Sequence, residues 1–277
     1  MKERTSCTAG ATRATGILRA MALRDHVIWW SGLLALPVLL GQAFHARRKT
    51  PLLPSAPAPH SGTWVPEAVS ESSAFSVFLV GESTVAGVGA RDHEHGLSGQ
   101  LALQLAERLR RPVRWEALGL NGARALDCLA GPIGLELPHR LNLVAPDLIV
   151  VVLGVNDTTK LTKRAEWRSV LPAIVKRLRG STSCPIFFTG VPPMESFTAL
   201  PWPLRSVLGA RARLLDEDIA RLVGEDSNCW HHAIDVELNG EDLAVDGFHP
   251  SESGYARWAA ELGAWVVSVG RWPSHGE

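Results

Sequence analysis

The segment "PDLIVVVLGVND", Pro146 to Asp157, decides the fold. It contains six consecutive apolar residues, Leu148 to Leu153, and lacks the alternation of a strand with one face in water. Such a run is typical of a strand covered on both faces, as in a parallel sheet. Small and polar residues, Gly154 to Asp157, follow it at once. We therefore expect a buried strand that ends in a polar turn.

Strand-like and helix-like segments alternate on both sides of this run. The strand-like segments are 74–81, 112–120, 184–193 and 231–237, and the helix-like segments are 97–111, 165–180, 204–224 and 251–270. A chain that alternates in this way builds a parallel sheet between layers of helices. We expect an α/β fold, a doubly wound (flavodoxin-like) parallel sheet with helices on both faces, over residues 74–271.

Composition excludes several function classes. The chain has 277 residues, a formal net charge of +0 and 46% hydrophobic residues, enough for one globular domain and additional segments. A nucleic-acid partner is not expected, because a phosphate-binding surface needs an excess of lysine and arginine. The four cysteines form no CxxC pair, so no zinc site of that type is indicated. We expect no cofactor.

The N-terminal region contains an uncharged run, Val27 to Phe44, of 18 residues. As a helix it would span about 27 Å, close to the hydrocarbon core of a bilayer at about 30 Å. Trp29 and Trp30 near one end suit a membrane interface. We expect one transmembrane or signal-anchor helix over 27–44 and a membrane-anchored, single-pass protein. A cleaved signal peptide is disfavoured, because Arg47-Arg48-Lys49 follow the run.

Both flanks of this run are expected to lie outside the folded domain. Residues 1–26 are an N-terminal tail, and 45–73 are a proline-rich, extended linker. Arginines before the run and the basic triplet 47–49 after it balance each other, so the side of the membrane that carries the domain stays open. If Met21 is the true start, the positive-inside rule places the domain in the cytoplasm.

Four short segments follow the predicted strands or precede the last helix. They are "GEST" (81–84), "GLNGAR" (119–124), "GVNDTT" (154–159) and "VDGFHPSESG" (245–254). Ligands of parallel sheets bind at the carboxyl ends of the strands. The first segment fits neither a P-loop nor the GxGxxG fingerprint, and Val85 breaks the GxSxG elbow of other hydrolases.

Together the four segments resemble the SGNH/GDSL hydrolase family over about 74–270. Gly81-Glu82-Ser83 stands where the family usually has Gly-Asp-Ser. Gly119-Leu120-Asn121 matches the second block and Gly154-Val155-Asn156-Asp157 the third. Asp246-Gly247-Phe248-His249-Pro250 matches the fourth. The departure is Glu82, which keeps the carboxylate of the aspartate and lengthens its side chain.

The resemblance implies a role for each matched residue. Ser83 is the expected nucleophile, His249 its general base and Asp246 the residue that orients the imidazole. The backbone amides of Ser83 and Gly119 and the side chain of Asn156 are the expected oxyanion hole. The remaining matched polar residues, expected to bind substrate, are Asn121 and Asp157.

The implied activity is a serine hydrolase that cleaves carboxylic esters through an acyl-enzyme intermediate. Its substrate would be a small-molecule or lipid-like ester. One alternative is an O-deacetylase of carbohydrate or cell-wall polymer. An alternative of another class is a catalytically silent binding domain on the same fold.

A histidine pair next to the first motif raises the question of a metal. His93 and His95 lie in the segment "DHEH" (92–95), but no further clustered ligand is evident. We expect a solvated, charged loop at the entrance of the site and no metal ion.

Overall fold

The computed structural model describes residues 23–32, 34–67, 73–224, 228–234 and 240–270. Within them a six-stranded sheet has the order β1-β3-β2-β4-β5-β6. The strands are β1 (Ser61–Trp64), β2 (Phe75–Gly81), β3 (Val113–Gly119), β4 (Leu148–Val152), β5 (Ile186–Thr189) and β6 (Cys229–His232). Strands β2 to β6 pair in parallel, and β1 pairs with the edge of β3 in antiparallel fashion.

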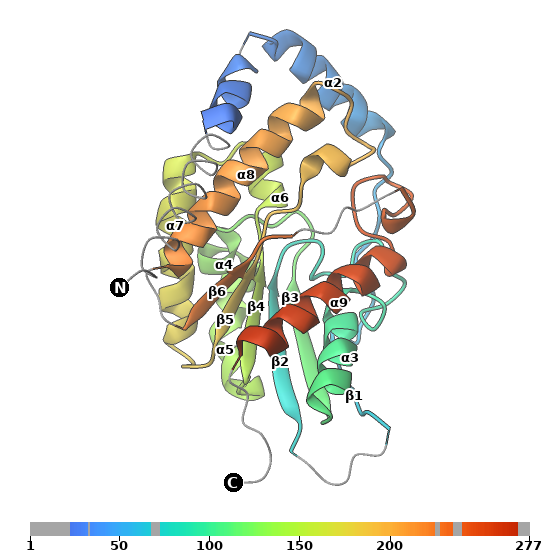
Figure 1. Ribbon diagram of the computed structural model, residues 1–277, viewed down its shortest axis with the longest axis vertical. Helices are drawn as coiled ribbons and strands as arrows, with labels where there is room; N and C mark the ends of the chain where they lie inside the picture. The colour runs from blue at the N-terminus through green and yellow to red at the C-terminus, as the bar shows by residue number, and fades with distance from the viewer. Residues whose placement is uncertain (1–22, 33, 68–72, 225–227, 235–239, 271–277) are drawn as a thin grey trace, which may run out of the picture.

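Helices cover both faces of the sheet (Figure 1). On one face lie α3 (Leu97–Leu109) and α9 (Glu252–Val269), and on the other α5 (Pro132–Val144), α7 (Arg164–Arg179) and α8 (Leu204–Val223). The short helices are α4 (Asp127–Ala130), α6 (Val155–Thr159), η1 (Met194–Ser196) and η2 (Gly240–Asp242). The predicted α/β fold with helices on both faces is confirmed, and the parallel strands follow the order 2-1-3-4-5 counted from β2.

Strand β4 shows why its sequence is apolar throughout. Successive side chains of a strand point to opposite faces. Ile149 and Val151 accordingly pack in the core beneath α5, α7 and α8, while Val150 packs in the core beneath α3 and α9. All five residues of β4 are buried. The last predicted strand, 231–237, begins within β6, but residues 235–237 lie outside the described residues.

The predicted linker, 45–73, is wrong in two places. Helix α2 (Leu36–Lys49) occupies its start, and β1 joins the sheet, with Ser61 opposite Glu116 and Trp64 opposite Val113. Prolines exclude a helix between these elements but permit extended backbone. The proline-free stretch "SGTW" is then available to pair with the edge of β3.

The region 27–44, predicted to form one transmembrane helix, is not a single helix. The region forms two helices, Leu23–Ser31 and α2, which meet at an angle of 86°. Gly32 lies in the break and Pro37 at the start of α2, where a proline is tolerated because no amide partner is needed. In the part of the chain that the structure describes, no single helix is long and apolar enough to cross a bilayer. Among the described helices, this bent pair reaches the required length and composition, but only when its two helices are taken together.

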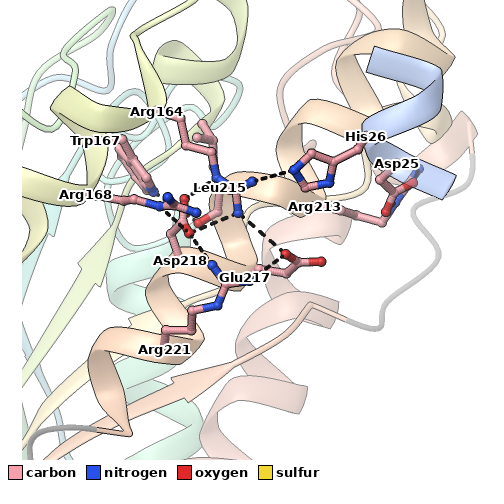
Figure 2. A network of polar contacts seen from close by, with 10 residues as sticks. All are labelled: Asp25, His26, Arg164, Trp167, Arg168, Arg213, Leu215, Glu217, Asp218 and Arg221. Carbon is pink, nitrogen blue, oxygen red and sulfur yellow. Dashed lines mark hydrogen bonds and ion pairs between the residues drawn. The ribbon is translucent and has the colours of Figure 1, made fainter. Parts of the chain in front are cut away.

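Charged contacts hold the helix Leu23–Ser31 against α7 and α8 (Figure 2). Both carboxylate oxygens of Asp25 accept hydrogen bonds from Arg213, at 2.8 and 2.9 Å. The His26 ring lies 3.2 Å from the Arg164 guanidinium, and the guanidinium of Arg211 lies 4.6 Å from the centre of the Trp29 ring. Asp25 is almost fully buried. One side of this helix is therefore built to contact protein.

Substitution of Asp25 should loosen this helix. In Asp25→Ala, Glu195 is the carboxylate partner that Arg213 keeps among the described residues, and a hydrogen bond to a charged group contributes about 1.5–3 kcal/mol. We expect the free energy of local opening to fall by a similar amount at the amides of 23–31, so that their hydrogen exchange becomes faster. The amides of the strands should keep their protection. Arg24→Ala, at an exposed neighbour, should leave exchange unchanged. Equal protection in both variants would contradict the docking role of Asp25.

Candidate active site

The ends of three strands pack so closely that no side chain fits between them. In register, Gly81 of β2 lies opposite Gly119 of β3 and Val152 of β4. A Cβ atom on Gly81 would lie 2.0 Å from the Val152 carbonyl oxygen, and one on Gly119 would lie 2.3 Å from the Ala86 amide nitrogen. Both positions therefore require glycine. This packing brings the turn after β2 against the loops that follow β3 and β4.

The turn after β2 carries Ser83, which begins a chain of hydrogen bonds. Its Oγ lies 3.0 Å from Nε2 of His249, and Nδ1 of the same ring lies 2.6 Å from Oδ2 of Asp246. The other carboxylate oxygen of Asp246 accepts the backbone amides of Phe248 and His249, each at 3.0 Å. The structure thus brings the three predicted catalytic residues into one line, although Ser83 and His249 are far apart in sequence.

The contacts of Asp246 fix its charge. Burial alone would raise the pKa of this carboxyl, but the hydrogen bonds from the His249 ring and from two backbone amides outweigh it and hold the pKa below its ordinary value. Asp246 is therefore ionised at neutral pH. An ionised carboxylate at Nδ1 keeps the ring proton on that nitrogen, so Nε2, which faces Ser83, has its lone pair available to accept the serine proton.

The segment that carries His249 is packed directly on the turn that carries Ser83. A Cβ atom on Gly89 would lie 2.3 Å from the Pro250 carbonyl oxygen, and the hydroxyl of Tyr255 donates to the Val88 carbonyl at 2.6 Å. Ser251 caps α9 by accepting the Gly254 amide. No sequence motif marks the hydroxyl of Tyr255 as a tether, so this contact could not be predicted.

Glu82 joins the turn after β2 to the turn after β4. Its Oε1 accepts the Val155 amide at 3.0 Å, and its Oε2 accepts both the backbone amide of Asn156 at 2.9 Å and the side-chain Nδ2 at 2.6 Å. A side-chain amide nitrogen carries two hydrogens, so one remains to donate elsewhere. The longer side chain that departs from the family pattern therefore holds Asn156, one of the expected oxyanion donors.

The same contacts set the titration of Glu82. Burial raises the pKa of this carboxyl from its ordinary value of 4.5 to about 7, although the Asn156 and Val155 amides act in the opposite direction. All three of its partners are N–H donors, which match an ionised carboxylate and not a protonated one. With a pKa of about 7, Glu82 changes charge around neutral pH, and protonation weakens its acceptance of the Asn156 and Val155 N–H groups.

Glu82 should make stability depend on pH. Between about pH 4.5 and 7 the folded chain holds a proton on Glu82 that the unfolded chain has released, so the free energy of unfolding falls as pH rises through this window. Glu82→Gln exchanges no proton there. We expect the variant to lose less stability than the wild type between about pH 5 and about pH 8 in denaturant unfolding. Glu136→Gln, at an exposed position, should follow the wild type; parallel curves for all three proteins would refute the raised pKa.

A largely apolar pocket opens beside Ser83 and His249. Its apolar lining consists of Val155, Pro192, Phe197, Ile234, Phe248, Pro250 and Trp258. Several of these residues come from the loops after β5 and β6, which carry no motif, so sequence reasoning did not find them. The only signal for Phe248 was its place inside the fourth family block.

Other predicted site residues lie elsewhere. The Asp157 carboxylate is buried, accepts the Ala125 amide at 2.8 Å and the Thr162 hydroxyl at 2.7 Å, and has a pKa raised by burial. It joins loops inside the protein and is not exposed to a substrate, so the prediction that it binds substrate is wrong. Asn121 is exposed in the turn after β3, and its role stays a prediction.

The histidines of the segment 92–95 have protein partners. Nε2 of His93 lies 2.8 Å from Nδ1 of His60, and Nδ1 of His95 lies 2.7 Å from the Asp92 carboxylate. His93 is buried, so the prediction of a solvated loop is wrong for this residue. Among the described residues, no group of three or more His, Cys, Asp or Glu side chains could hold a metal ion.

The fold and this geometry define a class: α/β proteins whose sheet edge aligns a serine, a histidine and an aspartate. The model of the GDSL-like Lipase/Acylhydrolase family matches residues 79–257, more than half of the chain. The chain belongs to this family and is an ester hydrolase.

The chain is also similar to a curated relative in sequence and to solved structures in fold. A GDSL-like esterase of Mycobacterium tuberculosis is 26% identical over 238 residues, which cover 81% of this chain and 74% of the relative. The carbohydrate acetylesterase Est24 of Sinorhizobium meliloti superposes with a TM-score of 0.52 at 18% identity, covering 71% of this chain and 100% of that one. A GDSL-like lipase of Bacteroides ovatus gives 0.54 at 16% identity, covering 70% of this chain. The match spans only 53% of that lipase, and both structures are similar in fold.

Proposed function

We propose that the protein is a serine esterase that cleaves carboxylic esters through an acyl-enzyme intermediate. The observation that carries this proposal is the continuous hydrogen-bonded line from Ser83 through His249 to Asp246. A serine hydroxyl is a weak nucleophile unless a base lies within hydrogen-bond reach, and the distance of 3.0 Å to Nε2 meets that need. A silent binding domain would not need this alignment.

In the first half of the reaction, Oγ of Ser83 bonds to the ester carbonyl carbon while its proton passes to Nε2 of His249. The carbonyl oxygen becomes an oxyanion, which the amides of Ser83 and Gly119 and the Asn156 side chain would stabilise. When the C–O bond to the alcohol breaks, His249 returns the proton to the leaving oxygen. Asp246, held ionised, stabilises the imidazolium throughout.

In the second half, water takes the place of the alcohol. His249 removes a proton from the water as its oxygen attacks the acyl carbon, and the same donors hold the second oxyanion. The bond to Oγ then breaks, Ser83 recovers its proton from His249, and the carboxylic acid leaves. The ester and one water molecule balance the reaction.

The lining of the pocket favours an ester with an apolar part. Phe197, Phe248 and Ile234 face the space beside Ser83, and burial of each methylene of a substrate against such a surface contributes about 0.8 kcal/mol. We therefore infer that small or lipid-like esters with a short hydrocarbon chain are better substrates than fully polar esters.

O-deacetylation of a carbohydrate is the second candidate. It needs the same serine chemistry, and a protein of similar fold, Est24, is named a carbohydrate acetylesterase. A panel of p-nitrophenyl esters of rising acyl length, together with acetylated sugars, separates the two candidates. Activity confined to acetyl groups on sugars would favour the deacetylase.

The serine assignment is tested by Ser83→Ala, because this change removes the nucleophile and leaves the packing of the turn intact. We expect no measurable ester hydrolysis, no labelling by a fluorophosphonate and an unchanged circular dichroism spectrum. Ser169→Ala, on the exposed side of α7, should keep both activity and labelling. Hydrolysis at the wild-type rate by Ser83→Ala would exclude the proposed mechanism.

Alanine variants of Asn156 and Asn121 should change different kinetic constants. Asn156→Ala removes a donor to the oxyanion, which we expect to lower kcat by about 10²–10³. Asn121→Ala, at an exposed position expected to contact substrate, should raise KM and leave kcat near the wild-type value. Steady-state kinetics with one soluble ester measure both constants. A kcat unchanged in Asn156→Ala would remove this residue from the oxyanion hole.

A further inference from the structure

The outer surface of the bent helix pair is strongly apolar. Its exposed apolar side chains are Val27, Trp30, Leu34, Leu36, Val38, Leu40 and Phe44. Leu34 is 91% exposed, Trp30 60% and Phe44 58%, so these side chains lie in solvent and not merely at the rim of the core. Single exposed leucines are normal in soluble proteins, but so many exposed large apolar side chains on one short helix pair indicate an interaction site.

Helix α2 has two distinct sides. Leu39 and Ala46 are buried, and the side chain of Gln42 donates to the Trp202 carbonyl at 2.7 Å and accepts the Leu204 amide at 3.1 Å. Leu36, Leu40 and Phe44 follow one another at intervals of four residues, which places them along one line of the helix. One side is therefore docked on the protein, and the line of apolar residues faces away from it.

The exposed charged side chains of the helix pair itself have one sign. Arg47, Arg48 and Lys49 occupy the last turn of α2 and are exposed, and the Arg48 guanidinium lies 4.2 Å from the centre of the Phe44 ring. Asp25 is the single acidic residue between positions 24 and 49, and it is buried against Arg213. The outer surface of the pair thus combines aromatic and aliphatic side chains with cations.

We propose that this surface lies in the interface of an anionic lipid bilayer, with the two helices parallel to the membrane plane. Apolar side chains together with arginine and lysine are the composition of helices that lie on membranes. Anionic headgroups complement the basic end of α2, whereas a second copy of the chain would bring like charges together. A spanning arrangement would require the 86° bend to straighten and the contact between Asp25 and Arg213 to break.

The proposed membrane surface and the Ser83 pocket share one end of the molecule. Gln42 of α2 contacts the stretch 202–204, and the same connection between η1 and α8 contains Phe197, which lines the pocket. Trp202, whose backbone carbonyl accepts the hydrogen bond from Gln42, is 71% exposed. In Figure 1 the bent pair lies at the end toward which the parallel strands run. A bilayer bound here would lie on the side of the pocket.

The test is flotation of the full-length protein with vesicles. We expect binding to vesicles of phosphatidylcholine and phosphatidylglycerol, weaker binding to phosphatidylcholine alone, and release from the mixed vesicles by alkaline carbonate. In the double variant Leu40→Glu, Phe44→Glu, binding should weaken about tenfold or more, because charge replaces the inserted side chains. Replacing Arg47, Arg48 and Lys49 by glutamine should remove the preference for phosphatidylglycerol.

Leu135→Glu is the matched control, because this leucine is 79% exposed on α5, away from the bent pair. It should bind vesicles as the wild type does, and all variants should hydrolyse a soluble short ester at the wild-type rate. The proposal is overturned if full-length protein fails to float with the mixed vesicles, or if the double variant floats equally well. Retention after carbonate extraction would show a spanning helix instead. A dimer that forms without lipid and is lost in the double variant would show that a second copy covers the surface.

Discussion

The arrangement of the site depends on one buried carboxylate. Glu82 extends from the end of β2 and accepts three N–H donors from the turn after β4, including the side chain of Asn156. Because Gly81 and Gly119 have no side chains, the strand ends approach closely enough for this contact to form. A shorter carboxylate in the same backbone would not reach the same donors. The residue next to the nucleophile thereby sets the position of the residue expected to face the developing charge.

Much of the sheet and of the site could be predicted from sequence because local signals and global structure agree there. The run from Leu148 to Leu153 is apolar throughout because β4 is covered on both faces, and glycine-bearing turns mark where strands end. Asp246 and His249 are three residues apart, so their contact is almost local. The contact between Ser83 and His249 spans 166 residues and became predictable only through the family motifs.

The rest depends on tertiary contacts that leave no local pattern. Asp157 belongs to a family block, but its surroundings turn its carboxylate toward Ala125 and Thr162. The run 27–44 has the length and composition of a membrane helix, yet partners distant in sequence decide its shape. Arg213 and Arg164 capture Asp25 and His26, and α8 supplies a site for Leu39. Hydropathy depends on the composition of such a run and takes no account of the charged residues beside it, which here dock the helix on the protein.

The segment between α2 and β1 has a mechanical consequence. Ala56 is buried, and its amide donates to the Ala86 carbonyl in the turn that carries Ser83, while β1 is fastened along β3 a few residues later. Prolines stiffen the stretch between these attachments. The N-terminal helices are consequently held in a fixed orientation on the catalytic domain, and are not joined to it by a flexible linker. A surface that binds them would set the tilt of the whole molecule and thereby the direction from which a substrate reaches the serine.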